Sequence, residues 1–134
     1  MKKLLLAVIV SLTTISSVAL AEIKVGIILG FTGPIETLTP AMRDSAKLAF
    51  AEVSSSGALL GGETITPLIG DSTCVDSDAA VAAAELIVND GAVAIMGADC
   101  SGVTGAIATN VAVPNGVTMV SPSATSPGLT SLAD

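Results

Sequence analysis

The sequence predicts an α/β fold in which a parallel sheet carries helices on both faces. Three observations support this prediction. Short apolar runs alternate with longer stretches of helical periodicity. Glycine, proline and small polar residues separate these segments at short intervals. The composition, 51% hydrophobic against 13% charged, is apolar enough to build a packed core.

Residues 1–21 are expected to lie outside this fold. Two lysines precede an apolar run at residues 4–10, and an Ala-Leu-Ala cleavage site ends at Ala21. This pattern is typical of a secretory signal peptide that is removed after Ala21. The alternative is an uncleaved membrane anchor, for which the apolar run is short. The mature chain would then begin at Glu22.

The mature chain is predicted to begin with a strand and a helix. Residues 23–29 form a nearly continuous apolar run, as expected for a strand buried on both faces. After a loop at residues 30–38, Thr39 is expected to cap a helix at residues 40–53, with Pro40 in its first turn. The apolar stripe of this helix is expected to comprise Met42, Ala46, Ala49, Phe50 and Val53.

A second strand and helix follow. The strand is expected at residues 64–69, where Pro67 indicates an edge position. A polar loop then leads into an alanine-rich helix at residues 78–88, which Asp76 or Ser77 can cap.

The last part of the chain repeats the pattern. A strand at residues 92–96 and a tight loop at residues 97–102 precede a helix at residues 103–111, which is expected to end before Pro114. A fourth strand is expected at residues 117–120.

Strands that alternate with helices through short connections favour right-handed crossovers. The expected sheet is therefore Rossmann-like, with strand order 2-1-3-4. Ligands of such sheets bind beyond the carboxyl ends of the strands, near the point where the strand order reverses. The loops at residues 30–38, 97–102 and 121–126 are the expected binding region.

Several classes of function are excluded or disfavoured. The chain has no histidine, tryptophan or tyrosine, which excludes histidine-dependent catalytic groups and zinc sites that contain histidine. Five basic residues against twelve acidic ones argue against a nucleic-acid partner. Nucleotide-binding glycine motifs and the serine-hydrolase motif are missing. The acidic segment with Asp71, Asp76 and Asp78 lacks the pattern of a calcium loop. We therefore expect no enzyme activity, no cofactor and no metal.

Two features could carry function. Cys74 and Cys100 are the only cysteines, so in an oxidising compartment they can pair only with each other. Two buried free thiols remain an alternative. Ser101 follows the third strand at the start of a helix, where its hydroxyl and the free backbone N–H groups can hold a carboxylate. The alternative is that Ser101 only caps its own helix, and that residues 121–126 form an ordinary polar loop.

These features, in this order along the chain, resemble a known protein family. The matching segments are Ile23–Gly26, Thr32–Pro34, Cys74 in an acidic loop, Cys100-Ser101 and Ser121–Thr125. Together they resemble the type I periplasmic binding proteins, and most closely the leucine/isoleucine/valine-binding proteins of branched-chain amino acid ABC transporters. The resemblance spans residues 22–134.

The resemblance implies a two-lobed protein that closes on a ligand in its cleft. Residues 22–134 would form a truncated N-terminal lobe of a longer gene product, called the intact protein below. Ser101 would hold the ligand's α-carboxylate. Thr125 and the backbone of Ser123 and Ala124 would hold the α-carboxylate and the α-ammonium group. A Cys74–Cys100 disulfide would lie beside the site. The remaining candidate ligand contacts are Phe31, Thr32, Asp99 and Cys100.

Two positions depart from the leucine-type pattern. Leu38 stands where those proteins have an aromatic residue, and Asp99 stands where they have an apolar one. An unpaired carboxylate near the ligand's side chain would disfavour a purely aliphatic ligand. Branched-chain specificity is therefore disfavoured, and a polar amino acid, an amide or another small zwitterion is open as the ligand.

The expected function is that of the extracytoplasmic solute-binding component of an ABC importer. It would reside in the periplasm, bind a small amino acid or a related molecule, and deliver it to the permease subunits. No stable membrane insertion is expected once the signal peptide is removed. The alternatives are the ligand-binding lobe of an exported sensor of the same fold and, less favoured, a doubly wound enzyme.

Overall fold

The computed structural model describes residues 22–132 as one α/β unit. The predicted signal peptide therefore lies outside the described residues. In chain order the elements are β1 (Glu22–Leu29), α1 (Thr39–Ser56), β2 (Thr64–Asp71), α2 (Ser77–Asn89), β3 (Ala92–Gly97), α3 (Ser101–Ile107), a π-helical segment (Ala108–Ala112), α4 (Val113–Asn115), β4 (Thr118–Val120) and a 3₁₀ helix (Pro127–Ser131).

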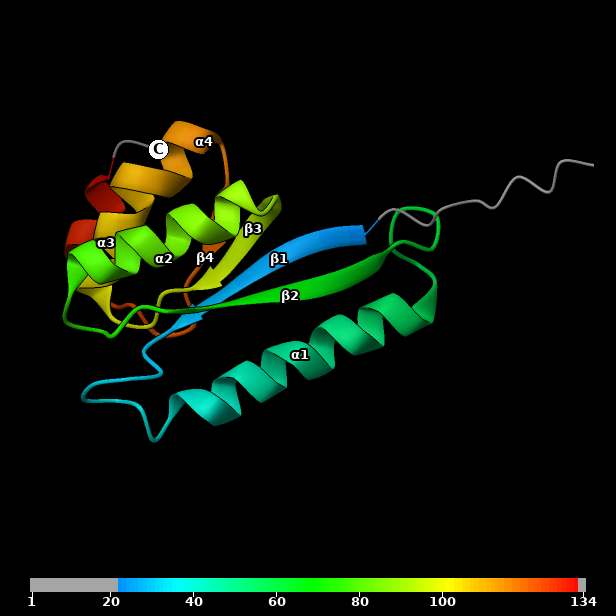
Figure 1. Ribbon diagram of the computed structural model, residues 1–134, viewed down its shortest axis with the longest axis horizontal. Helices are drawn as coiled ribbons and strands as arrows, with labels where there is room; N and C mark the ends of the chain where they lie inside the picture. The colour runs from blue at the N-terminus through cyan, green and yellow to red at the C-terminus, as the bar shows by residue number, and fades with distance from the viewer. Residues whose placement is uncertain (1–21, 133–134) are drawn as a thin grey trace, which may run out of the picture.

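The four strands form one parallel sheet in the order β2-β1-β3-β4, which confirms the predicted order. Helix α1 lies on one face, and α2 and α3 lie on the other (Figure 1). Within residues 22–132, Pro67 lies in β2, which pairs only with β1, so its predicted edge position is confirmed. Within residues 22–132 no helix is long and apolar enough to span a bilayer.

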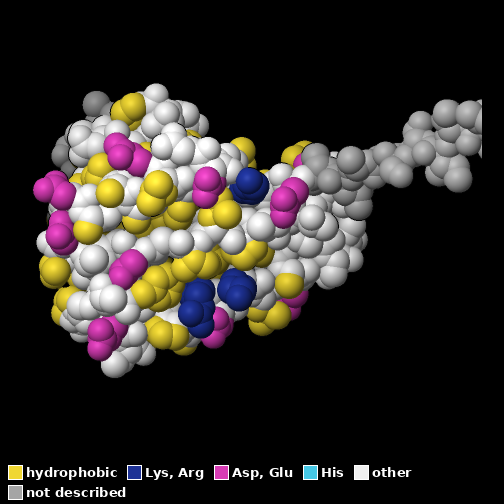
Figure 2. Space-filling view, in the orientation of Figure 1, with side chains coloured by type: hydrophobic (Ala, Val, Ile, Leu, Met, Phe, Trp, Pro, Cys, Tyr) yellow, Lys and Arg dark blue, Asp and Glu magenta, His cyan; other side chains and the backbone are white. Residues whose placement is uncertain are grey.

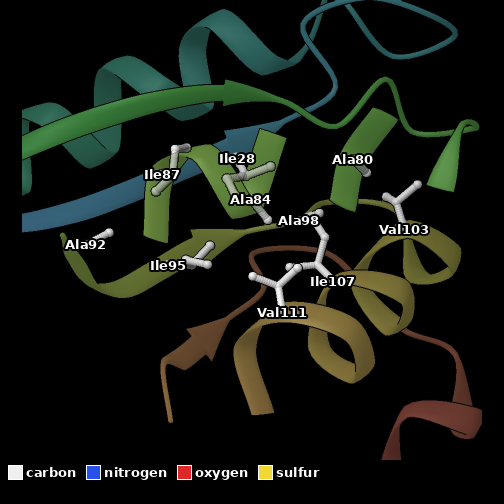
Figure 3. Packing of buried hydrophobic residues seen from close by; sticks show 10 residues of the cluster. All are labelled: Ile28, Ala80, Ala84, Ile87, Ala92, Ile95, Ala98, Val103, Ile107 and Val111. Atoms are coloured by element: carbon white, nitrogen blue, oxygen red, sulfur yellow. The ribbon is translucent and has the colours of Figure 1, made fainter. Parts of the chain in front are cut away.

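The main core lies between the sheet and the helices α2 and α3 (Figure 3). Ile28 and Ile95 point from the sheet toward Ile87 and Ile107 of the helices. Small residues allow this close packing: a Cβ at Gly26 or at Gly70 would lie 2.8 Å from the Ile87 side chain. Each fully buried isoleucine contributes about 1.5–3 kcal/mol, so this layer is the main source of stability.

Helix α1 differs from its prediction at both ends. It begins at Thr39, whose buried hydroxyl donates to the Gly30 carbonyl at 3.1 Å instead of capping the helix. This bond places Thr39 inside the first turn and ties α1 to the end of β1. The helix continues past residue 53 to Ser56, and Gly57 ends it with a φ of +67°.

The apolar stripe of α1 is narrower than predicted. Met42, Ala46 and Phe50 are partly buried, whereas Ala49 is exposed and Val53 is 41% exposed. The reason is that α1 lies over only β1 and β2, at one side of the sheet (Figure 1). A strip of apolar side chains is visible between α1 and α2, where the outer edge of β2 reaches the surface (Figure 2).

The third helical region also differs from its prediction. It begins at Ser101, two residues early, and Pro114 does not end it. Instead the chain widens into the π-helical segment and continues into α4, with the Val113 N–H bonded to the Ala108 carbonyl. The wider turn accommodates the proline ring, which would collide with the preceding turn of an α-helix. By contrast, the predicted cap of α2 is confirmed, because Asp76 accepts bonds from the backbone of Asp78 and Ala79.

Gly97 permits the close contact between the ends of β3 and β1. Its φ is +136°, and a Cβ at this position would lie 2.0 Å from the Ile28 carbonyl oxygen. No rotamer change can relieve this contact, because the backbone fixes the position of a Cβ and its partner is a backbone atom. A side chain at residue 97 must therefore displace the strand end that precedes the loop at residues 98–100.

Gly97→Ala is predicted to lower the free energy of unfolding of the intact protein by about 3 kcal/mol or more, from strain and overpacking. Gly102→Ala is the matched control, since a Cβ there meets nothing within 4 Å. Urea unfolding measures both. Equal stability of the two variants would contradict the steric role of Gly97.

Candidate ligand-binding site

The carboxyl ends of the four strands bring four loops together, and these loops are called the carboxyl edge below. They comprise residues 30–38, 72–76, 98–100 and 121–126. All residues that the sequence singled out for ligand contact lie in these loops or at the start of α3. Side-chain hydrogen bonds join each loop to another one, so the edge is a connected polar network.

Ser101 is the first residue of α3 and braces the loop after β4. Its Oγ accepts hydrogen bonds from the backbone N–H groups of Thr125, at 3.0 Å, and Ser126, at 3.1 Å. Because both lone pairs of the hydroxyl oxygen are engaged, a ligand can meet the Ser101 side chain only through the hydroxyl hydrogen. Ser101 is therefore suited to donate to a carboxylate. Its bonds run to another loop, so the alternative of a cap for its own helix is wrong.

The loop at residues 121–126 is held from within. Ser121 Oγ donates to the Ala98 carbonyl and accepts from the Ala124 N–H at 2.9 Å. Ser123 Oγ donates to the Asp99 carbonyl at 2.9 Å. The backbone N–H of Ala124 is thus already engaged. What Ser123 and Ala124 can still offer a ligand is their carbonyl oxygens, which suit an ammonium group.

Thr125 lies next to Ser101, as the binding hypothesis requires. Its backbone nitrogen is 3.0 Å from Ser101 Oγ, and its own side chain is exposed. A hydroxyl both donates and accepts, so Thr125 can meet either charged group of an amino acid. The structure therefore brings together a donor at Ser101 and acceptors at the following loop.

Asp99 is placed differently from its prediction. Its side chain is 3% exposed, and it is paired with internal donors instead of facing a ligand. The Gly30 N–H donates to Oδ2 at 2.8 Å, and the Cys100 N–H and the Ser72 hydroxyl donate to Oδ1 at 2.9 and 3.2 Å. The carboxylate is therefore not unpaired, and the reason for expecting it to disfavour an aliphatic ligand does not hold.

The predicted disulfide between Cys74 and Cys100 is confirmed, with the two Cα atoms 5.2 Å apart. It ties the loop after β2 to the residue before Ser101. A closed loop of this length contributes about 3–3.5 kcal/mol in the chain-entropy model. Cys100 has no thiol to offer, so any contact it makes with a ligand comes from its other atoms.

Next to this bridge, the loop after β2 holds two residues in the left-handed region. The φ angles of Thr73 and Cys74 are +55° and +70°. Such angles are strained for a β-branched residue such as threonine, and the surrounding bonds must maintain them. The disulfide is one of these bonds, and a hydrogen bond from the Thr73 N–H to Asp71 is another.

Asp71 organises the first loop, a role that sequence reasoning missed. Its carboxylate accepts from the Phe31 N–H at 2.9 Å, the Thr32 hydroxyl at 2.6 Å and the Thr73 N–H at 2.8 Å. The candidate contacts Phe31 and Thr32 are thus fixed at the rim, and the Thr32 hydroxyl is engaged. The position of Asp71 at the very end of β2, level with the end of β1, was the signal available in the sequence.

The same bonds shift the acidity of Asp71. Burial raises its pKa, but hydrogen bonds from the Thr32 side chain and from the backbone of Thr73, Thr32 and Phe31 outweigh burial, so the pKa lies below its ordinary value of 3.8.

At the same rim the Arg43 guanidinium lies 5.9 Å from the centre of the Phe31 ring. Phe31 is therefore held from both its backbone and its ring.

A groove of about 490 Å³ adjoins this network at Ser121. It runs between the α3 region, β4 and the 3₁₀ helix, and it shares only Ser121 with the carboxyl edge. Among residues 22–132 no three histidine, cysteine, aspartate or glutamate side chains cluster as a metal site would require.

Because the folded-state pKa of Asp71 is lowered, its carboxylate stabilises the fold above the ordinary pKa, and this contribution is lost as the pH falls through the folded value. Asp71→Asn is predicted to flatten the acid limb of the stability profile below the ordinary pKa of 3.8. Urea unfolding at a series of pH values measures this, with the exposed Glu85→Gln as control. An unchanged acid limb would contradict the role of Asp71.

Comparisons with known proteins show which family this chain resembles. The family model described as periplasmic binding protein matches residues 22–132. The Leu/Ile/Val-binding protein BraC3 of Rhizobium johnstonii is 33% identical over 128 residues, which are 96% of this chain and 34% of that protein. The leucine-, isoleucine-, valine-, threonine-, and alanine-binding protein of Pseudomonas aeruginosa is 35% identical over 115 residues, which are 86% of this chain and 30% of that protein.

A solved structure gives the same result. The branched-chain amino acid transporter substrate binding protein LivJ of Streptococcus pneumoniae, in complex with isoleucine, superposes with a TM-score of 0.72 and 30% identity. The match covers 82% of this chain and 31% of that one. The chain thus spans about a third of the length of its relatives. With its parallel sheet, its carboxyl edge and the family match over residues 22–132, the chain belongs to the periplasmic binding protein family.

Proposed function

We propose that the intact protein is the extracytoplasmic solute-binding subunit of an ABC importer. The observation that carries this proposal is the polarity of the carboxyl edge. The Ser101 side chain can offer only a hydroxyl hydrogen, and the neighbouring loop offers carbonyl oxygens and the Thr125 hydroxyl. A donor beside acceptors fits the carboxylate and the ammonium of an α-amino acid, each held by a charge-assisted hydrogen bond.

The ligand class that we propose is an α-amino acid with a small or branched aliphatic side chain. The names of two relatives support this choice: one is named for binding leucine, isoleucine and valine, and the other for binding these three, threonine and alanine. The paired state of Asp99 supports it as well, since it removes the reason to expect weak binding of leucine. The partners that we propose are the permease subunits of the importer, and the compartment is the periplasm.

We further propose that residues 22–134 are part of the N-terminal lobe and that later residues of the intact protein complete it. Strand β4 has three residues and pairs only with β3, and its Val120 is 65% exposed. The groove beside β4 is lined by apolar side chains such as Met119 and Leu129. Sheet edges of this kind are covered in stable proteins. A two-lobed protein about three times as long has the residues to cover this one.

Ser101→Ala in the intact protein is predicted to weaken amino-acid binding about 10- to 100-fold, because a hydrogen bond to a charged group contributes roughly 1.5–3 kcal/mol. Titration calorimetry with leucine, isoleucine, valine, threonine and alanine measures the affinities. Ser45→Ala is the matched control, because Ser45 lies on the exposed side of α1 and bonds only to Ala41.

Two results would contradict these assignments. Failure of the wild-type protein to bind any of the five amino acids would refute the ligand class. A loss of less than threefold for Ser101→Ala, together with a lower unfolding temperature, would mean that Ser101 only braces the loop after β4. Thr125→Val, which keeps the shape of the side chain, tests the second head-group contact in the same way.

The exported protein is predicted to begin at Glu22, because the Ala-x-Ala site ends at Ala21. Mass spectrometry of the periplasmic fraction after expression of the complete reading frame measures the mature N-terminus. A product that keeps Met1 and sediments with membranes would favour the uncleaved anchor instead.

A further inference from the structure

We propose that Asp99 is the positioning residue of the ligand site: it sets the places of the first, second and fourth loops relative to Ser101 without touching the ligand. The affinity part of this inference rests on the proposed function. The geometric part does not, because it concerns contacts within the carboxyl edge.

Asp99 is the one residue of the carboxyl edge whose hydrogen bonds reach all of its loops, among the residues that the structure describes. The carboxylate accepts from Gly30 after β1, from Ser72 after β2 and from Cys100 after β3. The backbone carbonyl of Asp99 accepts from Ser123 Oγ after β4, at 2.9 Å. Each partner lies within two residues of a candidate ligand contact or of a disulfide cysteine.

The disulfide cannot replace this connection. It joins the same two loops as the bond between Ser72 and Asp99, but it does not reach the loop after β1. That loop is held from the inside by the bond from the Gly30 N–H to Asp99 and from the rim by Asp71. A defect at Asp99 therefore breaks the bond between the inner end of the first loop and the loop after β3, even while the disulfide is intact.

The chemistry of the carboxylate makes an isosteric substitution informative. All three partners of the Asp99 side chain are donors, two N–H groups and one hydroxyl. In Asp99→Asn one side-chain oxygen becomes an NH2 group, which must face a backbone N–H in either rotamer. The shape of the side chain is kept, but the new NH2 donor faces a backbone N–H donor, so one hydrogen bond is lost. Ligand sites depend on geometry within about half an ångström, so the site should be affected.

The experiment compares Asp99→Asn, Ser72→Ala and the exposed Asp90→Asn in the intact protein, well below the unfolding temperature. We expect Asp99→Asn to weaken binding of leucine, isoleucine, valine, threonine and alanine tenfold or more, by about the same factor for each. Ser72→Ala, which removes one donor and leaves two, should lose about threefold. Asp90→Asn should be unchanged.

The pattern across ligands separates positioning from contact. A uniform loss supports positioning. A changed order of preference, above all a gain for leucine, would show that the carboxylate meets the ligand's side chain and would overturn the proposal. An affinity within twofold of wild type for both Asp99→Asn and Ser72→Ala would overturn it as well. Should Asp99→Asn fail to fold, the result for Ser72→Ala decides.

A second measurement needs no ligand. In amide spectra of the ligand-free protein, the Gly30 resonance should lie downfield in the wild type, as an N–H bonded to a carboxylate does, and should move upfield in Asp99→Asn. Resonances of residues 123–125 should shift with it. A Gly30 resonance that stays in place would overturn the proposal. Failure of all five amino acids to bind the wild type would refute the proposed function, and these spectra would still decide the role of Asp99.

Discussion

The carboxyl edge depends on one buried carboxylate. Asp99 lies where the central strands end, out of contact with water, and every donor that it needs comes from backbone or hydroxyl groups. A buried charge without donors would cost more than a domain of this size can offset, so the loops must approach it closely. The polar groups around it are therefore a requirement of the fold as well as of binding.

The architecture could be predicted from the sequence because it depends on patterns that repeat. Strand and helix order, the strand order of the sheet, the cap at Asp76 and the edge position of Pro67 follow from periodicity and local chemistry. Details that depend on tertiary contacts could not be predicted in this way. Thr39 donates to Gly30 instead of capping, and Pro114 continues a helix because a π-helical segment precedes it.

The site shows the same division. The sequence placed Ser101 and Thr125 in neighbouring loops, and they are neighbours, since parallel strands bring their carboxyl ends to one edge. The sequence pattern did not predict the direction in which the Asp99 side chain points. Asp99 could face the cleft or the interior, and only the positions of Gly30, Ser72 and Cys100 decide for the interior. The role of Asp71 in the first loop was missed because Phe31 and Thr32, its partners there, lie about 40 residues away in the chain.

The order of the strands has a consequence for how the chain folds. Strand β1 begins the described part of the chain, yet it lies in the interior of the sheet, between β2 and β3. It cannot complete its hydrogen bonding until residues up to Gly97 are available, since β3 supplies its second neighbour. Non-local pairing of this kind slows folding. A chain that folds slowly stays unfolded for longer, and an unfolded chain is the form that can be threaded through a membrane.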